Sequence, residues 1–506
     1  MNQRKAGALL SYVYLGLTFA VGIFYTPILL HFLGDSEFGV YSVANSAIAF
    51  LAILDLGFSQ TMIRYVSRCK ALNDETGEHK LNGMFLLLYA GIAVIALIAG
   101  IILCFNLNVL FDQGFTPDET AQLRIIFVIL LVNLVVSFPL GIYTSIISAN
   151  EGFFYLKFVN IISYVLTHVG ILLALCMGYK SVTMAMITTV VSIGLKLITA
   201  VYGTSRYQIH FLFHGFDKAL LREVFVFSFF IFLNIVIDQL YANTDKFILG
   251  ALCSSAVVTT YTLGVQFSSY FEQFSTSISG VFLPRITQLV TVSDNMKEVS
   301  ELFCRIGRVQ FILLGFLMSG FIVFGRQFIT LWVGGSQMEA YRIALVVILP
   351  ALIPLSQNLG ISVLRALNKH RFRSIIYFFI ALVNVGLSIP LALRFGGFGA
   401  ACATGFATCC GQIATMNWFY YKKIGLDIPG YWREIGKIIV PLVPITLLGA
   451  GIHWAFPLAG WGGLILQCIL YAGIFLALGW FVIFNQYEKN LIRSLLGRLV
   501  KLREKH

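Results

Sequence analysis

The sequence predicts an all-α polytopic membrane protein with fourteen transmembrane helices, arranged as two six-helix lobes in a parallel pseudo-twofold repeat plus two extra helices. Three observations predict this class: the composition, the spacing of apolar segments and the distribution of cations. Of 506 residues, 58% are hydrophobic and 11% are charged, whereas soluble domains carry about 25% charged residues. Uninterrupted apolar runs of about 20 residues fit spanning helices. They exclude a membrane β-barrel, because barrel strands alternate apolar and polar residues.

Fourteen apolar segments follow one another along the chain, each long enough to cross a bilayer. They lie at 8–31, 40–62, 82–105, 122–147, 158–178, 181–201, 224–247, 256–283, 309–333, 341–364, 375–394, 398–420, 438–456 and 462–485. The first run has no small-residue cleavage site, so it predicts an uncleaved span rather than a signal peptide. The shortest separations, at 178–181 and 394–398, each contain glycine. Without them each region would be one helix of about 40 residues, too long for a single crossing.

The cations divide unequally between the two sides of the membrane. With fourteen spans and both termini in the cytoplasm, 28 of the 35 Lys and Arg residues fall on the cytoplasmic side and five on the other. The remaining two, Lys196 and Lys246, lie within spans. This asymmetry is the positive-inside pattern, and removing any one span would destroy it. Topology therefore explains the net charge of +12, and no nucleic-acid partner is predicted.

A weak internal repeat divides the chain into two halves. Leu33-Gly34 resembles Leu249-Gly250, and Asn150 and Gly178 match Asn368 and Gly396 at nearly the same offset. Six spans in each half make the repeat parallel, as in transporters that rock two bundles around a central site. The predicted organisation is an N-lobe at 1–203, a cytoplasmic linker at 204–223, a C-lobe at 224–421, spans 13 and 14 at 422–485, and a cytoplasmic tail at 486–506. The tail has the pattern of a basic amphipathic helix, and it is predicted to lie on the anionic inner leaflet.

Charged and polar residues inside or beside the spans are the candidates for function. A charge at the bilayer centre costs at least about 2.5 kcal/mol and usually faces a bundle interior or a wet cavity. The candidates for a substrate or ion cavity are Asp55, Asn234, Asp238, Glu272 and Gln273, with Arg64, Arg285 and Arg365 at the inner ends of spans 2, 8 and 10. Two alternatives stay open: interhelical hydrogen bonds that only hold the bundle, and topology anchoring by the arginines. Asp245 and Lys246 are predicted to form a structural pair.

No catalytic, metal or cofactor motif emerges. The run from Gly430 to Ile438 resembles a phosphate-binding loop, but it has five residues between its glycines and ends in Ile where Ser or Thr must bind magnesium. The longest outer loop, 106–121, leaves no room for an external catalytic domain, which argues against a membrane enzyme such as a polysaccharide polymerase. The sequence therefore predicts a transporter with no cofactor and no metal, and it leaves coupling to H⁺ or Na⁺ open.

Three motifs carry a family resemblance. They are Leu33-Gly34-x4-Gly39-Val-Tyr41, Leu54-Asp55-Leu-Gly57-x6-Arg64, and Thr244-Asp245-Lys246 leading to Tyr261. Together with the fourteen spans they resemble the bacterial O-antigen-type polysaccharide flippases of the multidrug/oligosaccharidyl-lipid/polysaccharide exporter superfamily. The resemblance implies that the chain moves an undecaprenyl-diphosphate-linked oligosaccharide to the outer leaflet of the bacterial plasma membrane by alternating access, for surface polysaccharide assembly. The implied partners are this lipid-linked oligosaccharide, membrane lipids, a polysaccharide polymerase and glycosyltransferases.

Two alternatives within the superfamily remain open. Lipid II flippases carry arginines in their first span, whereas residues 8–31 contain no Arg or Lys. A cation-coupled drug or small-molecule antiporter would use Asp238 and Glu272 as alternating proton and substrate sites. Multidrug exporters usually have twelve spans and would lack residues 438–485.

Overall fold

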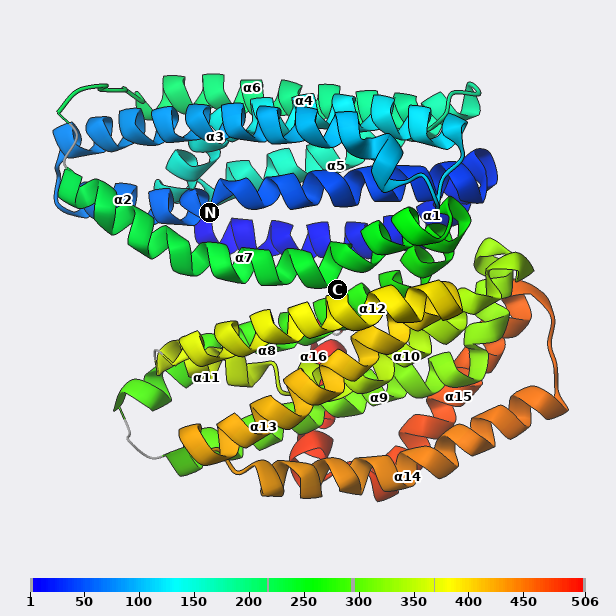
Figure 1. Ribbon diagram of the computed structural model, residues 1–506. Coiled ribbons are helices and arrows are strands. Elements are labelled where there is room, and N and C mark those ends of the chain that lie inside the picture. Colours follow the sequence, from blue (N-terminus) through cyan, green and yellow to red (C-terminus); the bar gives the residue numbers. More distant parts are fainter. Residues whose placement is uncertain (1–2, 216–217, 293–295, 368, 504–506) are drawn as a thin grey trace. The chain divides into compact units, whose positions relative to one another are not determined.

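A computed structural model describes residues 3–215, 218–292, 296–367 and 369–503 (Figure 1). All regular secondary structure in these ranges is helical, and eleven of the described helical segments are long and apolar enough to cross a membrane. The predicted class, an all-α polytopic membrane protein, is therefore confirmed. Parts of the predicted organisation lie outside the described residues: 1–2 of the N-lobe, 216–217 of the linker, 293–295 and Asn368 of the C-lobe, and 504–506 of the tail.

The chain forms two compact units. Unit 1 contains residues 1–262 and 385–400, and unit 2 contains 263–384 and 401–506. The predicted lobe boundaries stay predictions. The helices that lie in or begin in unit 1 are α1 (Gln3–Ala52), α2 (Phe58–Ala71), α3 (Glu75–Leu110), α4 (Pro117–Ala149), α5 (Phe153–Cys176), α6 (Ser181–Tyr207), α7 (Lys218–Leu252) and α8 (Ser255–Val292).

The remaining helices belong mainly to unit 2, although α12 also supplies residues 385–400 to unit 1. They are α9 (Met296–Val333), α10 (Met338–Ser356), α11 (Leu359–Ala366), α12 (His370–Ala407), α13 (Met416–Phe419), α14 (Ile428–Ala455), α15 (Gly460–Val482) and α16 (Gln486–Arg503). Two π-helical stretches, Thr408–Thr415 and Tyr420–Ile424, flank α13.

Two long helical stretches each contain a glycine break between predicted spans. The stretch Leu10–Ala71 has 62 residues and would be about 93 Å long if straight, several times one bilayer core. It is interrupted at Gly34, whose φ and ψ are 74° and 172°, and again near Gly57. The stretch Phe372–Ile424 is interrupted at Gly396, at 56° and −138°, within the separation that the sequence predicts at 394–398.

Each unit is organised around one long helix. In unit 1, α4 packs against α1, α3 and α6, and α3, α4 and α6 run beside one another (Figure 1). Helix α7 packs along α1 and α2. In unit 2, α9 packs against α10, α14 and α15. A buried core in unit 1 joins α2, α3 and α4, with Phe58, Met62, Phe85, Tyr89 and Ile142 at most 1% exposed.

Candidate functional site

A break inside a membrane helix shapes the candidate site in unit 1. Helix α1 ends at Ala52, a 3₁₀ turn covers Ile53–Asp55, and Leu56 and Gly57 take left-handed φ values of 52° and 73° before α2 begins. A Cβ atom on Gly57 would lie 2.5 Å from Cγ2 of Ile231 in α7. Two features therefore require glycine at position 57: the left-handed backbone conformation and the close approach of α7.

The break presents the carboxylate of Asp55 to the start of α2. The phenol of Tyr89 in α3 donates a hydrogen bond of 3.0 Å to Asp55 Oδ1, and the carboxylate also faces the backbone amides of Gly57 and Ser59. A helix N-terminus has unpaired N–H groups and the positive end of its dipole, which favour an anion there. No ion pair to Asp55 occurs among the described residues. Its negative charge is thus held by neutral donors.

Polar side chains continue along α2 from the break. Ser59 lies 3.1 Å from Ser145 of α4 between hydroxyl oxygens, and Thr61 lies 2.7 Å from Ser228 of α7. The guanidinium of Arg64 is exposed and stands 4.2 Å from the ring centroid of Phe227. The break and the first two turns of α2 therefore carry a carboxylate, hydroxyls that face α4 and α7, and a cation.

A second carboxylate of unit 1, Asp245 in α7, is also held by hydroxyls. Tyr261 of α8 donates to its Oδ2 at 2.5 Å, and Ser388 of α12 donates to its Oδ1 at 2.8 Å. Asp245 and Tyr261 are each 3% exposed, and Ser388 is fully buried. The predicted pairing of Asp245 with Lys246 stays a prediction. Consecutive helical side chains project about 100° apart.

A third polar group joins α1, just after its break at Gly34, to the starts of α4 and α8, on the predicted outer side. Glu119 completes a capping box with Thr116 at the start of α4. Its Oε1 also accepts hydrogen bonds from Ser36 of α1 and, at 2.5 Å, from Ser255 of α8. We call Ser36, Glu119 and Ser255 the outer latch. Gly39 allows this approach, since a Cβ there would lie 1.9 Å from the carbonyl oxygen of Ser255.

The outer latch has an ion pair beside it on α1. Lys180 lies 2.8 Å from Glu37, and its hydrogen bond to Glu37 raises the pKa of the lysine. Ser181, the first residue of α6, also donates to Glu37. These contacts tie the loop before α6 to the outer part of α1.

The other predicted site residues are distributed over both units. Asn234 is half-buried and Asp238 exposed on α7 of unit 1. Glu272 and Gln273 lie on α8 in unit 2, where Glu272 is exposed and the carbonyl of Gln273 accepts a hydrogen bond from Ser277. Two cations, Arg285 on α8 and Arg365 on α11, are exposed. Their roles in a cavity stay predictions.

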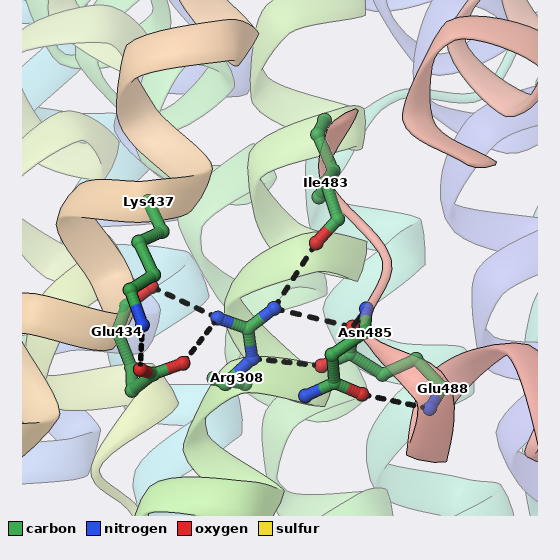
Figure 2. Close-up of polar contacts among 6 residues, drawn as sticks. All are labelled: Arg308, Glu434, Lys437, Ile483, Asn485 and Glu488. Carbon is green, nitrogen blue, oxygen red and sulfur yellow. Dashed lines mark hydrogen bonds and ion pairs between the residues drawn. The ribbon is translucent and has the colours of Figure 1, made fainter. Parts of the chain in front are cut away.

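Unit 2 contains a buried charge cluster around Arg308 of α9, shown in Figure 2. Its Nε donates to Glu488 Oε1 at 2.9 Å and its Nη1 to Glu434 Oε2 at 2.7 Å. Three further bonds reach Glu488 Oε2 and the carbonyls of Glu434 and Ile483. These five bonds match the five N–H donors of a guanidinium. Lys437 pairs with the other oxygen of Glu434 at 2.5 Å, so two cations balance two carboxylates.

Several partners in these groups were not predicted from the sequence. Tyr89 and Ser388 carry no local signal, because they lie far along the chain from Asp55 and Asp245. The sequence places Tyr261 in the third motif and among the polar side chains around Glu272, whereas its phenol donates to Asp245. From the sequence, Arg308 is only one of the 28 cytoplasmic cations, and it has no predicted pairing with Glu434 or Glu488. A carboxylate three residues before Lys437 on one helix is the signal that could have marked Glu434.

The sequence model of a family described as Polysaccharide biosynthesis protein matches residues 5–290, more than half of the chain. The chain belongs to this family. The resemblance predicted from the three motifs is thereby confirmed, and all three motifs lie inside the matched range. A Shigella flexneri protein named as an O-antigen transporter is 19% identical over 406 residues, covering 77% of this chain and 91% of its own length.

Solved structures of transporters share the fold of this polysaccharide biosynthesis protein. A lipid II flippase, MurJ, in an inward closed conformation gives a TM-score of 0.73 at 16% identity, over 96% of this chain and 100% of its own. An inward-facing multidrug resistance transporter of the MATE family and MOP superfamily gives 0.61 at 13% identity, over 81% and 94%. These proteins are transporters and flippases rather than enzymes.

Proposed function

We propose that the protein is a flippase that moves an undecaprenyl-diphosphate-linked oligosaccharide from the inner to the outer leaflet of the bacterial plasma membrane. The match of residues 5–290 to the polysaccharide biosynthesis family carries this proposal, and the O-antigen transporter of Shigella flexneri supports it. A diphosphate with several sugars cannot cross hydrocarbon unaided, because its charges and hydrogen-bonding groups would lose their partners. The transporter must supply those partners.

The polar groups of unit 1 suit this task. Sugars need hydrogen-bond donors and acceptors. The helix break offers Asp55, and α2 offers the half-buried Ser59 and the exposed Arg64. Irregular backbone at membrane depth is tolerated where it lies inside protein or lines a cavity, and broken helices form the substrate sites of many transporters. We therefore assign the break at 53–57 to the substrate path. Asn234 and Asp238 on α7 remain candidates for the same path.

The topology belongs to the same proposal. Each of the two glycine-broken stretches among the eleven apolar segments counts as two crossings. The 38-residue helix α8, which is not one of the eleven, adds one more. The total is then fourteen crossings. Both termini then lie in the cytoplasm, and the two halves form a parallel repeat. We infer that glycosyltransferases and a polysaccharide polymerase act before and after the transport of the lipid-linked oligosaccharide.

Alternating access requires contacts that close one side. The outer latch links α1 and α4 to the start of α8 through one carboxylate, Glu119. In the predicted topology it joins the two sequence halves on the outer side. Release of the substrate outward then requires the two hydroxyls to leave Glu119, a change that water can compensate because the contact between Ser36 and Glu119 is exposed.

Coupling to H⁺ or Na⁺ is the second part of the proposal. Both cations bind oxygen, and Asp245 with Tyr261 and Ser388 brings three side chains with oxygen donors together. Asp238 is the alternative site. Asp238→Asn keeps the shape and removes the charge, so a coupling role predicts normal abundance with lost ion dependence. A structural role predicts near-normal transport for Asn and lower thermal stability for Asp238→Ala.

The antiporter and the lipid II flippase remain the competing functions. The MurJ and MATE structures support the fold that all three share. The absence of Arg and Lys from residues 8–31 favours the oligosaccharide flippase over the lipid II branch.

Reconstitution tests the function directly. Vesicles containing the purified protein and an undecaprenyl-diphosphate oligosaccharide are treated with a membrane-impermeant glycosidase. We expect protein-dependent access to the inner-leaflet pool. Lipid II and a cationic dye serve as competing substrates, and preferential transport of either one would replace the proposed function.

A further inference from the structure

The start of α16 is fixed to the body of unit 2. Glu488, which is 4% exposed, binds Arg308 with both carboxylate oxygens (Figure 2). Asn485 and Glu488 also form reciprocal bonds: the amide of Asn485 donates to Glu488 Oε2 at 2.8 Å, and the amide of Glu488 donates to Asn485 Oδ1 at 3.0 Å. This arrangement is a capping box. The helix therefore leaves α15 in one defined direction.

The fixed helix presents two cations over one indole ring. Lys489 and Arg493 are four residues apart, hence on one face of α16, and they stand 5.8 Å and 5.5 Å from the ring centroid of Trp480 in α15. Like charges at this spacing repel one another, while the ring face attracts both. Among the described residues, neither cation has an ion pair, because Arg308 already binds the neighbouring carboxylate of Glu488.

A third cation lies beside an aromatic ring at the start of α16. The guanidinium of Arg305 in α9 is 4.8 Å from the ring centroid of Tyr487. Arg493 and Tyr487 are exposed. Tryptophan and tyrosine beside Lys and Arg form the usual anchor at the membrane–water interface, and basic residues there attract anionic lipids of the cytoplasmic leaflet.

We propose that Lys489, Arg493 and Trp480 form a binding surface for the phosphate head groups of anionic phospholipids at the cytoplasmic face. We choose an anionic lipid because of charge complementarity. Lys489 and Arg493, which form no ion pair among the described residues, both lie beside the ring of Trp480 at the predicted interface. Trp480 covers the glycerol region of the lipid, and its indole N–H is a further donor. Arg308 acts as a positioning residue. Its hydrogen bonds to Glu488 fix the start of α16, and with it the positions of Lys489 and Arg493. The surface is independent of the substrate that the protein transports.

Native mass spectrometry of the full-length protein in neutral detergent tests this surface. The probes are phosphatidylglycerol and phosphatidylcholine, each titrated separately. We expect the double substitution Lys489→Gln and Arg493→Gln to weaken phosphatidylglycerol binding about tenfold and to leave phosphatidylcholine binding unchanged. The matched control is Lys422→Gln with Lys423→Gln, which removes the same charge from another exposed pair of cations and should change binding less than twofold.

Three results would overturn the proposal. Unchanged phosphatidylglycerol binding in the double variant would remove the surface, and an equal loss in the control would reduce it to general electrostatics. Displacement of phosphatidylglycerol by undecaprenyl diphosphate at equal concentration would assign the cations to the transported lipid. Thermal unfolding of each variant is measured in parallel. If the double variant does not fold, Arg493→Gln alone is titrated, and a change below twofold then counts against the surface.

Discussion

Asp55 in the helix break of unit 1 and Arg308 in α9 of unit 2 are both charged residues that pack among helices, but their surroundings are opposite. Arg308 has all its donors occupied and two carboxylates beside it. Asp55 has one phenol and backbone amides as donors, and it forms no ion pair among the described residues. Arg308 is 5% exposed, whereas Asp55 keeps part of its surface accessible.

The difference separates a structural charge from one available for transport. A charge whose donors are saturated cannot take a new partner without losing an old one, so the Arg308 cluster holds α9, α14 and α16 together. A carboxylate held by neutral donors can accept a sugar hydroxyl or a cation while keeping its present contacts, because each oxygen accepts more than one hydrogen bond. We therefore assign transport to the break around Asp55 and stability to Arg308.

The largest expected effect is the loss of Arg308. Arg308→Met leaves the buried Glu488 without its cation, while Glu434 keeps Lys437. Breaking a buried pair in this way costs about 3–5 kcal/mol. We expect low abundance and a strongly reduced unfolding temperature in detergent. The measurement is fluorescence-monitored thermal unfolding of the purified variant.

A compensated variant sharpens this prediction. Adding Glu488→Gln to Arg308→Met removes the one uncompensated charge, since Lys437 still pairs with Glu434, and should restore more than half of the lost stability. If the double variant is no more stable than Arg308→Met, the cluster stabilises the protein through shape rather than charge.

The next largest effect is expected at the helix break itself. Gly57→Ala places a Cβ 2.5 Å from Ile231 at a positive φ, and the strain and overpacking together cost about 2–4 kcal/mol. Gly91→Ala in α3 is the matched control, since nothing lies within 4 Å of a Cβ there. We expect loss of transport and stability at position 57 only. Equal behaviour of the two variants would show that the break is not needed.

A smaller effect is expected from Tyr89→Phe. The ring is 1% exposed and packs near Phe58 and Phe138, so the phenylalanine keeps the packing and removes only the donor to Asp55. A hydrogen bond to a charged group contributes about 1.5 kcal/mol. We expect a lowered transport rate with near-normal abundance, measured by the vesicle assay. A rate equal to wild type would mean that the phenol does not position Asp55.

The sequence predicted the helices better than the contacts between them. All fourteen apolar segments are mainly helical, although 40–62 contains the break at 53–57 and 341–364 contains the turn between α10 and α11. The separations at 178–181 and 394–398 contain Gly178 and Gly396, both at positive φ. The predicted span 309–333 omitted the polar start of α9, which begins at Met296. A search for apolar segments leaves out the polar ends of helices. The sequence therefore did not predict that Arg308 lies within a helix.

Candidates for the site could be named from the sequence only in part, for a similar reason. A carboxylate in an apolar run is visible in one sequence, so Asp55 could be named as a candidate, and its role stays a prediction. Its donor Tyr89 lies on the next helix, and Ser388 lies 143 residues from Asp245. Such partners depend on tertiary packing, and helical periodicity carries no information about them.

The central claim, that Asp55 serves transport rather than stability, is tested most directly by Asp55→Asn in the vesicle assay. The variant keeps the shape and can still accept a hydrogen bond from Tyr89. The account predicts an unfolding temperature within about 2 °C of wild type, since less than about 1 kcal/mol is lost, and a flipping rate per folded molecule at least about tenfold lower, or roughly 1.4 kcal/mol. A normal flipping rate, or a rate that falls only in step with stability, would contradict it.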